Sequence, residues 1–308
     1  MLKKIKTLML ACLAAVPFLS GTLSAQASEN QWDKPTFVHG VGLSQQEVPQ
    51  VADLLGIKNT DQVTTITVDG QDFQKYLGYP GVDSQLISSV LVEKTSKGSG
   101  VQVDIATPQN ITLITSKQYS NAAITAGVAD VNIKVASIRS ATGESALTGV
   151  YKALEANGET LDPERMKVAQ EELETTGKIA EGMSEKQAEG LDAAIIEIKS
   201  QLQDLVKKTD GLATQEDIER IINEALAKYG LENVVTPDQV NQLIIFFNNF
   251  QMTDAINSEE LKEQLNQLAG RLGGEVQKLI KNAEESGFLD KIINFFKNLW
   301  QSIFGAVI

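Results

Sequence analysis

Gly143, Glu144 and Ser145 open a predicted helix and form a candidate anion-binding site. The first turn of a helix has backbone N–H groups without helical partners, and the helix dipole is positive there, so the turn can bind an anion. A P-loop is excluded because no lysine follows the glycines. Glycines in this pattern more often serve structure, Gly143 in a tight turn and Gly149 in close helix packing. The segment is therefore a candidate anion site with a structural alternative.

The sequence has almost no histidine or cysteine residues that could serve in catalysis or metal binding. The chain has one histidine, His39, and one cysteine, Cys12, which lies in the predicted signal peptide. A Ser-His-Asp site would need His39 as its base, and we expect His39 to be an ordinary loop residue. Cysteine zinc sites are excluded from the mature chain, and neither H-E-x-x-H nor an EF-hand loop occurs. We predict no catalytic residues, no metal and no cofactor.

Carboxylates are the remaining candidates for catalysis. Two acidic residues in one cleft with separated pKa values can hydrolyse a glycoside, and a sequence does not show which residues meet in space. Asp69, Asp72 and Asp83 could also meet at a cation, although helix capping and turns explain them equally well. A secreted carboxylate-dependent hydrolase is therefore the enzymatic alternative.

An amphipathic helix is predicted near the end of the chain, from Phe288 to Phe304. Large apolar residues share one of its faces: Phe288, Ile292, Phe296, Leu299, Trp300 and Ile303. Such a face with lysines beside it is typical of helices that lie on a membrane surface, and equally of a terminal helix that docks on a bundle. We expect this face to contact a membrane, a partner or the rest of the chain, and a membrane-active helical protein is a further alternative.

An α/β region over residues 40–158 must position the candidate anion site. Alternating apolar residues predict a sheet of about four strands, near residues 63–68, 87–92, 101–105 and 131–135. The turn residues Lys97 to Gly100 favour a hairpin that pairs the second and third of these strands. Thr115 or Ser116 can cap a helix that Gly127 ends.

Helical patterns dominate after Gly158. Heptad-like spacing and helix start signals, such as Thr214 with Asp217, predict a bundle of helical hairpins. The fold class is therefore α+β, a small α/β domain followed by an all-α bundle. The predicted segments are a signal peptide 1–27, a flexible lead-in 28–39, an α/β domain 40–158, a bundle 159–287 and a terminal helix 288–308.

The first 27 residues have the pattern of a secretory signal peptide: lysines, an apolar core and the small-residue site Ala25-Gln26-Ala27. Cleavage would leave no cysteine, and 24 basic against 40 acidic residues, a net charge of −16. We predict a protein that is secreted or associated with the cell envelope. Such an acidic chain is a poor ligand for nucleic acid, which needs a basic surface.

Four sequence motifs resemble the YpuA-like secreted proteins of Gram-positive bacteria, a domain family of unknown function. The motifs are Lys75 to Gly78 (KYLG), Ile87 to Val90 (ISSV), Tyr119 to Val128 (YSNAAITAGV) and Thr142 to Gly149 (TGESALTG). The resemblance implies export and a common fold. It implies no activity and no catalytic residue. Our leading hypothesis is a non-enzymatic envelope or extracellular binding protein, whose ligand, partner and oligomeric state the sequence does not identify.

Overall fold

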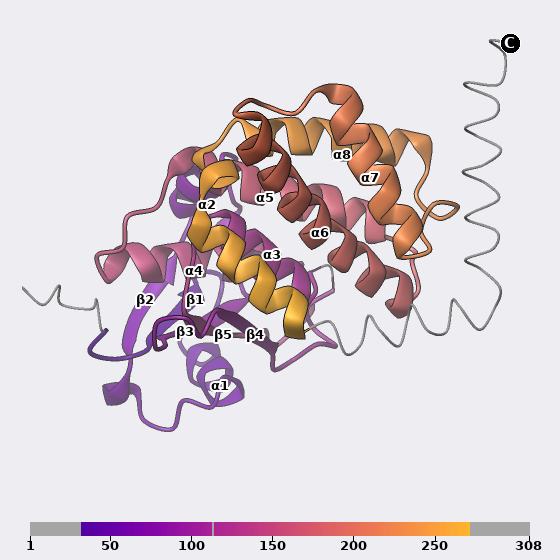
Figure 1. Ribbon diagram of the computed structural model, residues 1–308. Coiled ribbons are helices and arrows are strands. Elements are labelled where there is room, and N and C mark those ends of the chain that lie inside the picture. The colour runs from indigo at the N-terminus through magenta and orange to yellow at the C-terminus, as the bar shows by residue number, and fades with distance from the viewer. Residues whose placement is uncertain (1–31, 113, 272–308) are drawn as a thin grey trace, which may run out of the picture. The chain divides into compact units, whose positions relative to one another are not determined.

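The computed structural model describes residues 32–112 and 114–271 (Figure 1). The predicted signal peptide, residues 272–287 of the predicted bundle and the predicted terminal helix 288–308 lie outside the described residues. The strands are β1 (Thr36–Gly40), β2 (Thr64–Val68), β3 (Ser89–Lys94), β4 (Val101–Ile105) and β5 (Val131–Ala136). The first four helices are α1 (Glu47–Leu54), α2 (Gly70–Leu77), α3 (Ser116–Thr125) and α4 (Glu144–Ala156). After them come α5 (Pro163–Ala180), α6 (Glu185–Thr209), α7 (Gln215–Lys228), α8 (Pro237–Gln251) and a helix whose described part covers 259–271.

The five strands form one mixed sheet in the order β2-β1-β3-β5-β4. The two outer pairs, β1 with β2 and β4 with β5, are parallel, whereas β3 runs antiparallel to both of its neighbours. A parallel pair needs a long crossover, and α3 supplies it between β4 and β5. The α+β fold class predicted from the sequence is confirmed.

The sheet has a strand that the sequence prediction missed. Residues Thr36 to Gly40 lie within or next to the predicted flexible lead-in, yet they form β1, which pairs with both β2 and β3. Phe37 and Val38 are buried on opposite faces of the sheet, and this burial fixes a segment too short to show a strand period. His39 is accordingly a strand residue and not the loop residue that we expected.

The predicted β3–β4 hairpin is wrong, because β5 lies between these two strands. The loop that joins β3 to β4 crosses the start of β5 at Asp130. The N–H of Thr95 donates to the Asp130 backbone carbonyl at 2.8 Å, and the N–H of Gly100 donates to its side chain at 2.8 Å. Turn residues therefore do occur at 97–100, but they bridge over a third strand.

The two faces of the sheet are covered differently. On one face α4 packs across β1 and β3, and a Cβ atom on Gly149 would lie 2.8 Å from Val90 Cγ1. The structural interpretation of Gly149, close helix packing, is thereby confirmed. On the other face a smaller apolar cluster joins α1 to the sheet through residues such as Val51, Leu55 and Phe37.

The predicted helical region is confirmed over the described residues, and it shares its core with the sheet. One apolar cluster extends from Val90 of β3 to Phe247 of α8 and Leu265 of the 259–271 helix. Predicted caps hold these helices: the side chains of Thr115, Asp162, Thr214 and Thr236 each accept a hydrogen bond from a backbone N–H of the first turn. Helix α5 packs against α2 and α3, which fixes its position.

Candidate functional site

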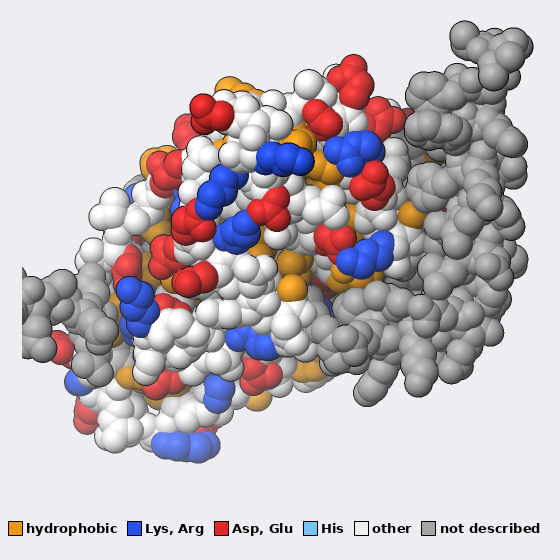
Figure 2. All heavy atoms as spheres, viewed as in Figure 1, with side chains coloured by type: hydrophobic (Ala, Val, Ile, Leu, Met, Phe, Trp, Pro, Cys, Tyr) orange, Lys and Arg blue, Asp and Glu red, His pale blue; other side chains and the backbone are white. Residues whose placement is uncertain are grey.

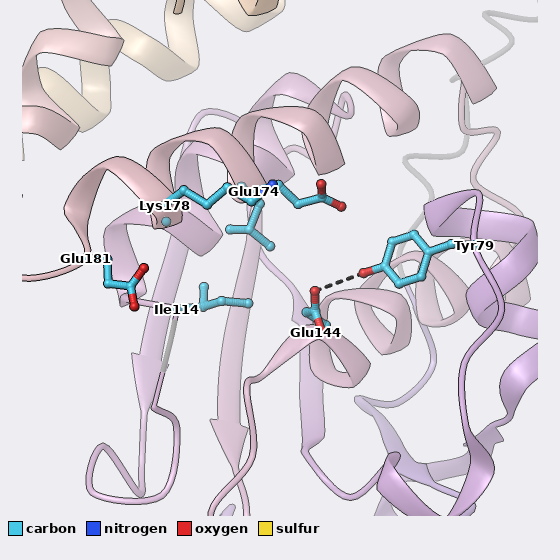
Figure 3. Close-up of a pocket in the computed structure, with 8 residues that line it drawn as sticks. Tyr79, Ile114, Glu144, Glu174, Lys178 and Glu181 are labelled. Atoms are coloured by element: carbon cyan, nitrogen blue, oxygen red, sulfur yellow. Dashed lines mark hydrogen bonds between the residues drawn. The ribbon is translucent and has the colours of Figure 1, made fainter. Parts of the chain in front are cut away.

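Two neighbouring cavities lie where α2, α4 and α5 meet, and Tyr79 and Glu144 line both of them. The first, which we call the α5 cavity, has a volume of about 410 Å³ (Figure 3). Its lining consists of Tyr79, Ile114, Glu144, Leu173, Glu174, Gly177, Lys178 and Glu181. The second, which we call the serine cavity, has a volume of about 530 Å³ and is rich in hydroxyl groups. Volumes of this size are typical of sites for small ligands.

Tyr79 forms the partition between the cavities and is held from both sides. Its hydroxyl donates to Glu144 Oε1 at 2.9 Å and accepts a hydrogen bond from Gln170 Nε2 at 3.2 Å. Gln170 Nε2 also donates to Glu174 Oε1 at 3.0 Å, so one buried amide links the two sides of the α5 cavity. Burial, and secondarily the charge of Glu144, raises the pKa of Tyr79. The tyrosine is therefore a neutral hydrogen-bonding group at any physiological pH.

The loop that carries Tyr79 is shaped by glycine. Gly78 ends α2 with φ of 83°, a conformation that favours glycine. Gly81 follows Tyr79 and Pro80, and a Cβ atom there would lie 2.8 Å from the ring of Phe73. The left-handed backbone at Gly78 and the close approach of Gly81 to Phe73 set the path of the loop that carries Tyr79.

The predicted site residues Gly143, Glu144 and Ser145 do meet at the start of α4, beside the serine cavity. Gly143 has φ of 107° and its carbonyl accepts a hydrogen bond from Tyr119 at 2.5 Å, which fits the predicted tight turn. Ser145 Oγ donates to the Ser88 carbonyl at 3.0 Å, and Ser88 Oγ accepts from the N–H of Ala146 at 3.1 Å. One donor of the first helical turn is thus already bonded, and the turn itself contains the negatively charged Glu144. The anion site stays a prediction, in competition with this carboxylate.

Gly177 is the lining residue that needs an explanation, because it lies within α5, in the last turn before the helix ends at Ala180. Glycine in a helix interior costs about 1 kcal/mol relative to alanine. Gly149 of α4 has a packing reason, but a Cβ atom on Gly177 would have no heavy atom within 4 Å. The glycine therefore leaves space on the wall of the α5 cavity that no neighbouring side chain uses.

The inner face of α5 is fixed by a buried ion pair. Lys199 of α6 is fully buried and donates to Glu172 Oε1 of α5 at 2.5 Å and to Thr125 Oγ1 of α3 at 2.7 Å. Thr125 in turn bonds Glu172 Oε2 at 2.6 Å. This network ties three helices together directly behind the cavity wall. Asp192 of α6 is also buried, and its burial raises its pKa to about 7.

The other acidic candidates have structural roles. Asp69 caps α2 by accepting from the N–H groups of Gln71 and Asp72, and Asp83 accepts from the N–H of Gly70 at 2.8 Å. Over residues 32–112 and 114–271, no group of histidine, cysteine or acidic side chains is arranged to hold a metal ion. No helix in the same part of the chain is long and apolar enough to cross a membrane. The apolar face predicted at Phe288, Ile292, Phe296, Leu299, Trp300 and Ile303 lies outside the described residues.

The charged groups on the face with α6 and the 259–271 helix are interspersed and do not gather in a basic patch (Figure 2). Ion pairs such as Lys207 with Glu259 and Lys262 with Asp204 connect neighbouring helices there. Exposed pairs of this kind contribute little to stability. This face therefore offers no strong electrostatic site, unlike the α5 cavity, whose lining has three glutamates and one lysine.

Comparisons with known proteins place the chain in a family. A family model described as "Protein of unknown function (DUF1002)" matches residues 39–268. The chain belongs to this family. It is also 31% identical over 269 residues to "Uncharacterized protein YpuA" of Bacillus subtilis (strain 168), and the match covers 86% of each chain. The resemblance to the YpuA-like proteins is thereby confirmed, and no solved structure matches the chain.

Sequence reasoning found only one side of this site. It selected Glu144, but it missed Tyr79, Gln170, Glu174 and Gly177, which lie on other elements. Tyr79 stands in a turn sequence and the others in an ordinary helical pattern, so only their contact in space distinguishes them. One signal was available: Gly177 lies within a helical pattern, in the last turn before the helix ends at Ala180.

Proposed function

We propose that this protein is an exported, non-enzymatic binding protein of the cell envelope or extracellular space, and that its ligand occupies the α5 cavity. The observation that carries the binding proposal is Gly177. A helix gives up stability at this residue and keeps a space open beside polar groups that are already oriented by hydrogen bonds. The signal-peptide pattern of the first 27 residues supports export.

Filling the cavity is the direct test of the binding proposal. In Gly177→Phe, the ring would enter the space beside Leu173 and Tyr79, whereas Gly177→Ala adds one methyl group and leaves most of the space free. The mature protein, residues 28–308, would be mixed with isolated cell envelopes and the bound fraction measured after sedimentation. We expect binding by the parent and the alanine variant and loss of binding by the phenylalanine variant. Equal binding by all three, with folding verified by circular dichroism, would contradict the proposal.

Contact with a membrane surface is the form of the proposal that involves the segment 288–308. The supporting observation is its sequence, whose apolar residues recur at helical spacing with lysines beside them. Co-sedimentation with anionic phospholipid vesicles, with and without residues 288–308, tests this contact separately from the cavity. Binding that depends on the segment would support it, and binding that survives the deletion would overturn it.

A carboxylate-dependent hydrolase is the second candidate, and one observation favours it. Glu144 and Glu174 line one cavity and are connected through Tyr79 and Gln170. An acid and a base on two sides of a scissile bond would need such a pair. Release of reducing ends from purified cell-wall glycan, lost in Glu144→Gln and in Glu174→Gln, would support this candidate over simple binding.

A further inference from the structure

The chemistry of the α5 cavity indicates which kind of group it accepts. Its charged lining residues are Glu144, Glu174, Glu181 and Lys178, so negative charges outnumber positive ones. No ion pair joins any of these four side chains to another described residue. Figure 3 shows Glu174 and Lys178 on α5 and Glu181 just after its end, with Tyr79 and Glu144 across the cavity. An anionic ligand would meet a repulsive lining here, and a cation an attractive one.

A second observation concerns hydrogen bonding at the wall. Gln170 is only 3% exposed, and its amide nitrogen bonds both Tyr79 and Glu174. Its Oε1 has no hydrogen-bond partner among the described residues. Gln170 itself does not line the cavity, but its nitrogen orients two lining groups, Tyr79 and Glu174, whose oxygens can accept further hydrogen bonds, so a ligand that donates hydrogen bonds suits the wall better than one that accepts them.

The size and apolar part of the cavity exclude a bare metal ion as the best occupant. The acidic side chains are not arranged as a metal site over residues 32–112 and 114–271, and the cavity holds about 410 Å³. Its base is apolar, with Ile114 and Leu173, and the Tyr79 ring stands at one side. An alkyl chain can pack on such a base, and the face of an aromatic ring attracts an ammonium group.

We propose, building on the binding function above, that the α5 cavity accepts a primary ammonium group on an alkyl stem, as carried by a lysine side chain of an extended peptide. The ammonium group has three donors and no acceptor, which matches the carboxylates of Glu144 and Glu174 in the lining. The stem packs on Ile114 and Leu173. Lys178 at the rim opposes the ligand and sets an upper limit on its affinity.

The test uses two capped pentapeptides that differ only at the central residue. This residue is lysine in one peptide and uncharged norleucine in the other, and the remaining four residues of each are glycine. Binding to the mature protein, residues 28–308, is measured by titration calorimetry at low and at physiological ionic strength. We expect the lysine peptide to bind, and to bind more weakly as salt increases. Free butylamine serves as the third ligand: binding as strong as that of the lysine peptide would overturn the peptide as the source of the amine.

Two substitutions on α5 should change the affinity for the lysine peptide in opposite directions. Glu174→Gln keeps an acceptor for Gln170 but removes a charge, and we expect about tenfold weaker binding of the lysine peptide. Lys178→Gln removes a positive charge and should bind it several-fold more tightly. Glu171→Gln, on α5 but bonded to Asn249, is the matched control and should leave affinity unchanged. Tighter binding by the Glu174 variant, weaker binding by the Lys178 variant, or equal affinity for the norleucine peptide would overturn the proposal.

Failure of this proposal is separable from failure of the binding function. If Gly177→Phe abolishes envelope binding while neither peptide binds and the charge variants bind envelopes normally, the cavity binds a ligand of another class. If Gly177→Phe leaves envelope binding intact, the cavity is not the site of envelope binding and the proposed binding function is overturned. The peptide proposal is then judged by the calorimetry alone.

Discussion

Helices α4 and α5 both have an interior glycine, but the two glycines meet opposite surroundings. Around Gly149 of α4 the strands leave no room for a side chain, since Val90 and Val38 would lie 2.8 and 3.2 Å from its Cβ. A Cβ atom on Gly177 of α5 would have no heavy atom within 4 Å apart from the backbone of its own helix. The first glycine allows a helix to approach a sheet, whereas the second maintains a cavity. The same residue type therefore marks a packing site in one region and a candidate binding site in the other.

The inner faces of the two helices also differ. α4 packs on the sheet through apolar and small side chains such as Ala146 and Val150, while α5 is fixed to α3 and α6 by the buried Lys199–Glu172 pair. Apolar packing tolerates small shape changes, but removing one partner from a buried pair leaves an uncompensated charge. The cavity wall is thus the more vulnerable of the two regions to a single substitution.

The largest expected effect comes from breaking that pair. Lys199→Met should lower the free energy of unfolding by about 3–5 kcal/mol, because Glu172 would remain buried without its cation. Urea denaturation at pH 7 measures it. The double variant Lys199→Met with Glu172→Gln is the control and should recover part of the loss. A single variant as stable as the parent would show that the pair does not fix α5.

A substitution at Asp192 should change the free energy of unfolding by a similar or smaller amount, and this change depends on pH. Its pKa is raised from 3.8 to about 7, first by burial and then by Glu172 and Glu189, with Lys117 acting in the opposite direction. The folded protein therefore holds a proton that the unfolded chain releases, so stability falls as the pH rises from about 4 to 7. Asp192→Asn imitates the protonated form.

The asparagine variant should be about 2–4 kcal/mol more stable than the parent at pH 8 and nearly equal to it at pH 4. Thermal denaturation across this range measures the difference. A difference between variant and parent that stays constant from pH 4 to pH 8 would contradict the assignment of the titration to Asp192.

A matched pair of alanine substitutions tests the comparison of the two glycines directly. Gly149→Ala places a methyl group against Val90 and should destabilise the protein by about 1–3 kcal/mol, although alanine is the better helix former. Denaturant midpoints measure the change. A neutral result would mean that α4 can move away from the sheet without loss.

The smallest change in the free energy of unfolding is expected at Gly177, and it has the opposite sign to the change at Gly149. Gly177→Ala should stabilise the protein by about 0.5–1 kcal/mol, since the methyl group enters free space and the unfolded chain loses conformational freedom. The same denaturant titration measures it. Destabilisation here would mean that the space beside α5 is not available to a side chain.

Local signals were enough to predict much of the fold. Capping residues such as Asp69, Thr115 and Thr214 and the alternating residues of β4 and β5 act within one turn or one strand. The errors came from contacts between distant residues. β1 is short and is stabilised by two neighbouring strands, and β5 separates β3 from β4 although a turn sequence joins them.

The candidate site was predicted only in part for the same reason. Glu144 follows a helix start signal, but its partner Tyr79 precedes it by 65 residues and Gln170 belongs to another helix. No periodicity connects these residues. A glycine within a helix, such as Gly177 in the last turn of α5, can be recognised in a sequence, but only the structure shows whether the missing side chain is required by packing or leaves a cavity.

The outer edge of β4 is bonded by residues far along the chain. Gln264 Oε1 accepts a hydrogen bond from the N–H of Val101 at 3.2 Å, and Arg271 Nη2 donates to the Val101 carbonyl at 2.8 Å. A ribosome releases the N-terminus first, so the sheet residues emerge well before Gln264 does. Until then, an unprotected strand edge is available for pairing with other chains. Chains shortened before Gln264 should therefore aggregate during synthesis, even though every strand of the sheet is present.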